Sequence, residues 1–405
     1  MNQATDIDWH LFFQSLNDSN QDFRDEPVLP HSSILLLPFA LKDDIDIGGI
    51  HISKSESVQL AGALSVAYLS SVTATSFSLP GWLDTEPFCH PLAQALAISL
   101  TFVTGYRCGF AANIPNYTSL DQLTEAQKQL AGLELPLITS GNCCNHIVPS
   151  DPDYEHYINT LRQLTLFLKS PQLESGKREQ ILRSMELLAR AISLQKVDHG
   201  LALSLIVAAI EAAADAHYAD LKPVEFLNQQ ENGEVDKFKR FVHSLRVDNA
   251  DIYRQHKSAL RRIVSRTIDY FANQFYSTRK FIRFVERYAP YATWDSLARH
   301  PYFDLPGGEQ LIHPEPPWSQ RPSGISEEGL ERLLKDTYGY RSKYVHCALQ
   351  PPGAGATTTS TYFEKIFDWN SECETSVIKL SLLFGIARKC LLTWLVDGIS
   401  INGDT

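Results

Sequence analysis

The sequence predicts a mainly α-helical fold in which a C-terminal helical bundle with a large helical insertion follows a mixed α/β domain. From about residue 154 onward, apolar residues recur at the spacings of three and four that mark one face of a helix. Short runs of β-type residues bounded by turn residues lie earlier in the chain. A length of 405 residues favours two domains. We therefore expect an N-terminal domain over 1–150, of sensory or regulatory type, and a helical domain over 151–405.

The expected N-terminal domain combines strands and helices. The runs SSILLLP at 32–38 and GGIHI at 48–52 are short, apolar and flanked by turn residues, which predicts two strands. Residues 55–71 and 91–106 are expected to be helical, the second with a proline in its first turn, where the missing N–H costs nothing.

The helical domain should start with two core helices at 176–194 and 199–218, followed by an insertion at about 222–325. Within the insertion, residues 236–290 indicate two or three helices, and six prolines in 301–324 exclude a regular element there. Ser326 is a plausible N-cap for a third core helix. Apolar residues at alternating steps of three and four predict a closing helix over 374–397.

Charge is distributed unevenly along the chain. The net charge of −11 argues against indiscriminate nucleic-acid binding, yet residues 236–290 carry 13 bases against 5 acids. This basic segment is expected to form an RNA-binding face to which Arg261, Arg262, Arg266, Arg279, Lys280 and Arg283 contribute. In the alternative interpretation, its apolar residues, including Ile252, Ile263 and Ile268, face a core and the basic residues are only solvated.

The remaining composition predicts an intracellular protein without a metal centre. The first residues lack the pattern of a signal peptide, and no apolar run reaches the 18–20 uninterrupted residues of a membrane span. Seven scattered cysteines without paired Cys-x-x-Cys spacing favour reduced thiols over disulfides or zinc. We expect a cytoplasmic location, no membrane contact, and no metal or other cofactor.

The segment YRSKYVH at 340–346 contains the candidate catalytic pair, Arg341 and His346. A permanently charged guanidinium beside an imidazole that titrates near neutrality suits metal-free cleavage of a phosphodiester. Ser342 and Tyr338 share a helix face with His346, and Lys343 supplies a second cation. Positions five apart diverge by about 140° around a helix. Either the long arginine wraps around, or a second copy completes a composite site in a homodimer.

Another interpretation of this pair is structural. A histidine near a helix C-terminus stabilises the dipole, and a nearby arginine often forms a surface ion pair. Short Arg–His spacings also arise by chance in a chain with 13 histidines.

The YRSKYVHC segment, the bundle order and the upstream LIVAAIEAAAD helix resemble the Apea-like HEPN domain family over about 175–400. Members of that family are α-helical bundles, commonly dimeric, in which an Arg-x(4–6)-His motif marks metal-independent ribonucleases of antiphage, toxin–antitoxin and RNA-processing systems. This chain has Cys347 where the family usually has glycine. Glu211 on the upstream helix either orients a partner in the site or is an ordinary surface charge.

The resemblance implies an endoribonuclease, in antiphage defence or a toxin-like system. His346 would transfer the proton during attack of a ribose 2′-hydroxyl on the adjacent phosphate. Arg341 would bind the phosphate and stabilise its developing charge, leaving a 2′,3′-cyclic phosphate. In the alternative, the domain is a non-catalytic HEPN-type module for dimerisation or nucleotide sensing.

Overall fold

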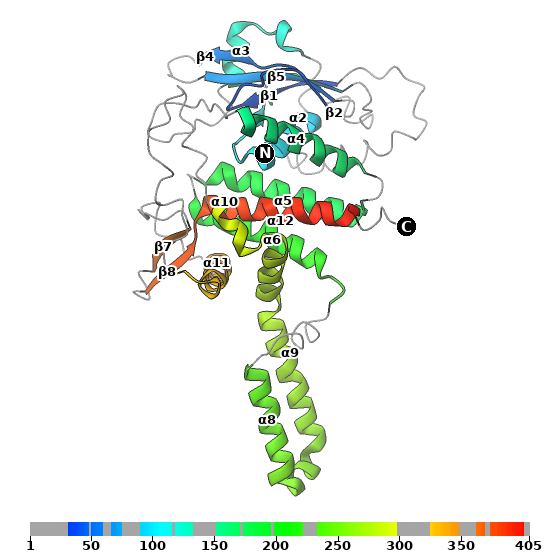
Figure 1. Cartoon of the computed structure of the whole chain (residues 1–405), viewed down its shortest axis with the longest axis vertical. Helices are drawn as coiled ribbons and strands as arrows, with labels where there is room; N and C mark the ends of the chain where they lie inside the picture. The colour runs from blue at the N-terminus through cyan, green and yellow to red at the C-terminus, as the bar shows by residue number, and fades with distance from the viewer. Residues whose placement is uncertain are drawn as a thin grey trace.

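The computed structural model describes residues 31–47, 50–59, 66–74, 90–115, 118–132, 151–170, 173–195, 198–221, 233–297, 325–347, 362–368 and 373–400. Most of these residues are helical, and a small antiparallel sheet lies in the N-terminal part. Figure 1 shows three regions along the long axis: the sheet at one end, stacked helices in the middle, and a two-helix arm at the other end. The mainly helical fold with an N-terminal mixed region is confirmed at this level.

The sheet has the order β2-β3-β5-β1-β6, and β4 also pairs with β5. The strands are β1 His31–Leu37, β2 Ile45–Ile47, β3 Ile50–Ile52, β4 Glu56–Gln59, β5 Val66–Ala74 and β6 Gly109–Phe110. β1 is buried on both faces, because Leu35 and Leu37 belong to one hydrophobic cluster and Ile34 and Leu36 to another. This double burial explains the uninterrupted apolar run that predicted the strand.

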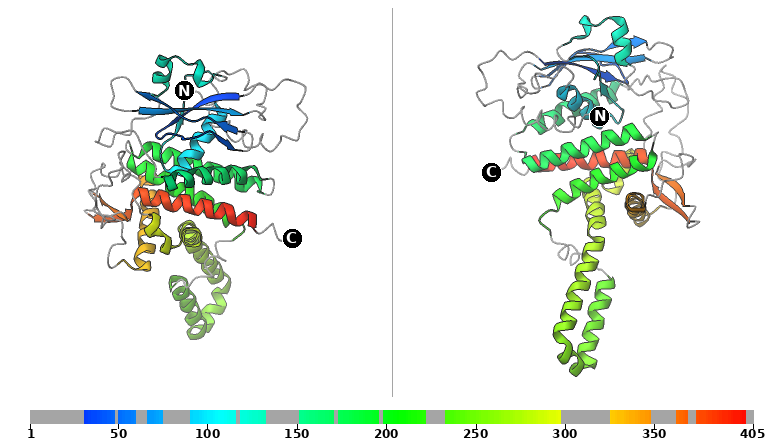
Figure 2. Two further views of the ribbon diagram at one scale, coloured as in Figure 1. Left: turned by 45° about the horizontal axis from the view of Figure 1, so that its top comes forward. Right: turned by 180° about the vertical axis from the view of Figure 1, so that it is seen from behind.

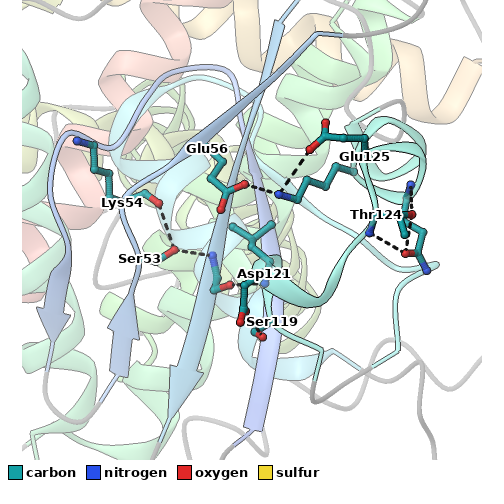
Figure 3. A network of polar contacts seen from close by, with 11 residues as sticks. Ser53, Lys54, Glu56, Ser119, Asp121, Thr124 and Glu125 are labelled. Atoms are coloured by element: carbon teal, nitrogen blue, oxygen red, sulfur yellow. Dashed lines mark hydrogen bonds and ion pairs between the residues drawn. The ribbon is translucent and has the colours of Figure 1, made fainter.

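The two faces of the sheet are covered differently. On one face lies α2 (Pro91–Thr104), which starts with the expected proline and ends at Gly105 in the left-handed conformation that glycine tolerates. The other face carries η2 (Leu120–Gln122) and α3 (Glu125–Gly132). Polar contacts hold this cover in place: Lys128 bonds Glu56 of β4 at 2.5 Å, and the Leu120 N–H donates to Ser71 of β5 at 3.1 Å (Figure 3).

The expected helix over 55–71 is wrong, since β4 and β5 occupy its described residues. β5 pairs with β1 along the whole of β1, from His31 opposite Ala74 to Leu37 opposite Tyr68. Alanine and leucine favour helix locally, but backbone pairing with a completely buried strand outweighs that preference here.

The middle region is a set of packed helices (Figures 1 and 2). They are α4 Asp151–Lys169, α5 Ser175–Leu194, α6 His199–His217, the second half of α9 Ala250–Tyr288, the short η3 Tyr291–Thr293 and α10 Trp294–Leu297, α11 Glu327–Cys347 and α12 Leu380–Ser400. α6 is central and packs against α5, α9, α11 and α12. Its length and apolar composition are those of a membrane span, but this helix is mostly buried among these neighbours and Asp198 caps its N-terminus.

One hydrophobic cluster runs from the sheet into the helices, from Leu35 through α2 to Met185 and Trp394. The second half of α9 belongs to this core, because Phe281, Phe284 and Val285 are buried. Residues 276–288, which lie inside the expected insertion, therefore pack as a core helix.

The first half of α9 and α8 (Gly233–Asp248) form the two-helix arm. Here the alternative interpretation of the basic segment is wrong in part, since Ile252 and Ile263 are 55% and 54% exposed rather than packed in a core.

A β-hairpin of β7 (Phe363–Asp368) and β8 (Cys373–Ile378) precedes α12, so the N-terminal end of the expected closing helix is a strand. The hairpin lies against α11, where the Ile378 N–H donates to the buried Thr337 hydroxyl at 2.8 Å. The Gly329 N–H donates to the Ser326 hydroxyl at 3.2 Å, which confirms Ser326 as the cap of α11.

Candidate functional site at the junction of α6, α9 and α11

The candidate site is a polar junction at which α6 supplies carboxylates and α9 and α11 supply cations. Glu211 and Asp215 are four residues apart on α6, so both side chains lie on the same face of that helix. Glu211 pairs with Arg341 of α11, and Asp215 pairs with Lys280 of α9. Two ion pairs therefore connect the three helices on the same side of α6.

Arg341 is held by Glu211 at a distance of 3.1 Å between Nη2 and Oε2. Its side chain is 23% exposed and that of Glu211 is 18% exposed, so the pair lies at the edge of the core and can still be reached by solvent. Because a guanidinium has five N–H donors, a carboxylate on one edge leaves donors for a second anion.

Tyr338, one turn before Arg341, completes the junction. Its hydroxyl donates to the other carboxylate oxygen of Glu211 at 2.7 Å, and its ring packs against Phe281 of α9 at a centroid distance of 5.2 Å. Burial, followed by the hydrogen bond to Glu211, raises the pKa of Tyr338, so this hydroxyl stays protonated and acts as a donor.

The structure thus brings together three of the residues singled out in the sequence: Glu211, Tyr338 and Arg341. Glu211 is not an ordinary surface charge, because both of its oxygens are engaged by α11. Ser342, Lys343 and His346 follow on the backbone of α11, which extends to Cys347, and their side chains lie outside the described residues.

The six basic residues expected to bind RNA separate into two groups. Arg261, Arg262 and Arg266 are exposed on the arm, whereas Arg279 and Arg283 are half-buried beside the core. Lys280 is 7% exposed, is paired with Asp215, and lies 4.1 Å from the centroid of the Tyr276 ring. Lys280 therefore stabilises the junction of α6 and α9, and its charge is already compensated.

Two histidines that the sequence did not single out occupy defined polar environments. His199, at the start of α6, bonds Glu364 of β7 at 2.5 Å, and this hydrogen bond raises its pKa against the opposing effect of burial. At the other end of α6, burial and then the nearby Arg287 and Lys177 lower the pKa of His217 to about 4. Their partners come from distant parts of the chain, so no local spacing could have revealed them.

The part of the chain that the structure describes contains no group of three or more metal-ligating side chains. Cys108 and Cys390 are buried free thiols, and burial raises the pKa of Cys108 to about 12, so this thiol is not a reactive nucleophile at neutral pH. The other cysteines lie outside the residues whose side chains are described.

No family model, curated protein or solved structure matches this chain. The class that the fold and the junction define is therefore a helical domain with a mixed N-terminal region, in which a partly accessible arginine is oriented by a carboxylate on the central helix.

Proposed function

We propose that this chain is a metal-independent endoribonuclease of the HEPN type, acting in the cytoplasm in antiphage defence or a toxin-like system. The observation that supports this most is the orientation of Arg341 by Glu211 and Tyr338, on the same helix that carries His346. A preorganised guanidinium is suited to hold a phosphate and to stabilise charge that develops on its oxygens.

In the proposed reaction, the 2′-hydroxyl attacks the adjacent phosphorus and the bond from phosphorus to the 5′-oxygen breaks. His346 accepts the proton that leaves the 2′-hydroxyl or donates a proton to the departing 5′-oxygen, and solvent water is the partner for the other transfer, because an imidazole titrates close to neutral pH. Ser342 and Lys343 are candidates for phosphate contacts, and Tyr338 acts by holding Glu211.

Arg341 and His346 are five positions apart on α11, which puts their side chains about 140° apart around the helix axis. We therefore propose a homodimer in which the two copies of α11 face a shared cleft, so that Arg341 of one copy acts with His346 of the other. The exposed Arg261, Arg262 and Arg266 of the arm would bind the RNA backbone outside this cleft.

The test is RNA cleavage by the purified protein in EDTA. We expect His346→Ala and Arg341→Ala to reduce cleavage at least a hundredfold, within the range that general acid–base catalysis and charge stabilisation supply. Matched controls are the exposed His156→Ala and Arg183→Ala, the latter from an exposed ion pair with Glu179. Cleavage that survives both α11 exchanges would overturn the site assignment.

The ion pair of Arg341 with Glu211 also favours a second candidate function, a non-catalytic module for dimerisation or nucleotide sensing. In that case the arginine joins α6 to α11 or binds a nucleotide phosphate. Specific nucleotide binding without cleavage of any RNA would favour this alternative.

A further inference from the structure

The arm formed by α8 and the first half of α9 carries several large apolar side chains that are exposed. Its two helices pack through residues such as Val242 and Leu260, which are partly buried. By contrast, Phe241, Ile252, Ile263 and Tyr270 are between 54% and 64% exposed. Large apolar side chains grouped on one surface indicate a site of interaction.

The exposed apolar side chains of α9 form one continuous strip. Ile252, Ala259, Ile263 and Tyr270 recur along α9 at steps of seven, four and seven, which places them in one row about 27 Å long. Between this row and α8 runs a groove of about 290 Å³, lined by Leu245, Ile252, Tyr253, His256, Ala259, Leu260 and Ile263. This lining is almost entirely apolar, so it suits the side chains of an amphipathic helix better than the phosphates of RNA.

The groove has a positive border. Arg262 and Arg266 are exposed and four apart on α9, directly beside the apolar row. Residues 237–270 carry nine bases against three acids, a net charge of +6. The complementary partner is therefore an acidic segment with apolar residues at helical spacing.

The N-terminal segment of this chain has that chemistry. In DIDWHLFFQSLND at 6–18, Trp9, Phe12, Phe13 and Leu16 have the i, i+3, i+4, i+7 spacing of one helix face. The first 23 residues contain four aspartates and neither lysine nor arginine. Residues 1–30 lie outside the described part of the chain. We propose that residues 6–18 of one copy bind the apolar groove on the arm of a second copy.

Chain length favours binding between copies over binding within one. Leu16 is 15 residues from His31, the start of β1, and a fully extended chain of that length spans at most about 54 Å. The sheet and the arm lie on opposite sides of the helical layers (Figures 1 and 2). Crossing those layers at about 8–10 Å each, and then following about 20–36 Å of α9 beyond Tyr276, requires a linker that is almost fully extended or longer than these 15 residues allow. If residues 6–18 of each copy bind the arm of the other copy, the two contacts are equivalent and the result is a dimer with twofold symmetry.

The test is sedimentation velocity of the full-length chain and two variants. Trp9→Ala shortens the proposed anchor, and Ile263→Glu puts a negative charge into the groove. Ser258→Glu is the matched control, because it adds the same charge at an exposed position about 140° away on α9. Each lost contact should weaken association about tenfold, and each homodimer loses two contacts, so both variants should dimerise about a hundredfold more weakly than the original chain.

Mixing the two variants makes the test specific. In the heterodimer, the unchanged N-terminal segment of the Ile263→Glu copy can bind the unchanged arm of the Trp9→Ala copy. Because one of the two contacts is kept, the heterodimer should form about tenfold more tightly than either variant homodimer. A monomeric original chain at tens of micromolar would overturn the proposal. So would an effect of Ile263→Glu without one of Trp9→Ala, which would indicate that arms pair with arms. Loss of RNA affinity with unchanged association would assign the groove to RNA. These outcomes do not depend on whether the chain cleaves RNA.

Discussion

Glu211 is the residue on which the candidate site depends most directly. It accepts a hydrogen bond from Tyr338 at 2.7 Å and pairs with Arg341 at 3.1 Å, so one carboxylate fixes two side chains of α11. If Glu211 is replaced by a neutral residue, the partly buried charge of Arg341 loses its ion-pair partner. The guanidinium is then less strongly oriented and samples more conformations. In the proposed site, we therefore expect Glu211 to be a positioning residue that acts through Arg341.

We predict that Glu211→Gln lowers kcat for RNA cleavage about tenfold and leaves KM nearly unchanged. Glutamine retains an acceptor for Tyr338 but loses the charge that orients the guanidinium in the transition state. Steady-state kinetics measures the two parameters separately. The matched control is Glu186→Gln, whose carboxylate is also 18% exposed and pairs with Arg190 on the surface of α5. An equal loss in both variants would contradict the positioning role.

Among the structural elements, the β7–β8 hairpin is joined to the helical core by a bond between Glu364 and His199, and the strength of this bond depends on the protonation of the histidine. Glu364 bonds His199 at the start of α6 and also accepts the Leu380 N–H at 3.2 Å at the start of α12. The bond to Glu364 raises the pKa of His199, and Asp198 beside it acts in the same direction. One carboxylate thus connects the hairpin to two core helices.

The raised pKa of His199 fixes the sign of its pH dependence. The bond between protonated His199 and Glu364 contributes fully to stability below about pH 6.5, which is the pKa of histidine in the unfolded chain. This contribution is lost as the pH rises through the higher pKa of His199 in the folded protein. We predict that Glu364→Gln destabilises the protein by about 1.5 kcal/mol at pH 6, the scale of a hydrogen bond to a charged group. Thermal unfolding at a series of pH values measures this. The difference should shrink at alkaline pH, and a constant or growing difference would contradict it.

Comparison of the predicted and observed elements shows which sequence patterns are sufficient to predict secondary structure. The run at 32–38 predicted β1 because its apolar residues serve two buried faces, and the apolar periodicity predicted α5 and α6. The sequence predicts helix for residues 66–71 and 374–378, which are strand in the structure, because their pairing with β1 and β7 is made between segments that local preferences do not connect. Local preferences do not contain that information.

For the candidate site, the sequence indicated Arg341, Tyr338 and Glu211, since they lie on adjacent core helices with recognisable patterns. It did not indicate that Lys280 forms an ion pair with Asp215, because Asp215 is 65 residues away along the chain. It also did not separate the exposed arginines of the arm from the half-buried ones. That difference arises where α9 leaves the core.

At the scale of the whole molecule, the proposal places RNA binding on the arm and the reaction in the helical body. The arm projects from the side of the helical layers opposite the sheet and carries exposed arginines (Figure 2). Arg261→Gln should therefore weaken RNA binding and reduce the slope of log affinity against log salt by about 0.7, the value for one contact with single-stranded phosphate. Lys280→Gln should leave the slope unchanged, because Asp215 already compensates that charge. Titrations at several salt concentrations measure both slopes, and a reduced slope only for Lys280→Gln would contradict this division.

The chemistry of the cleaved ends tests the central claim most directly. The purified protein is incubated in EDTA with an RNA strand and with the DNA strand of the same sequence, and the termini are analysed by mass spectrometry. A ribonuclease that uses the 2′-hydroxyl, with Arg341 and His346 in the site, leaves a 2′,3′-cyclic phosphate and a 5′-hydroxyl on RNA and does not cut DNA. Cleavage of both strands, or RNA products with a 3′-hydroxyl and a 5′-phosphate, would contradict the mechanism.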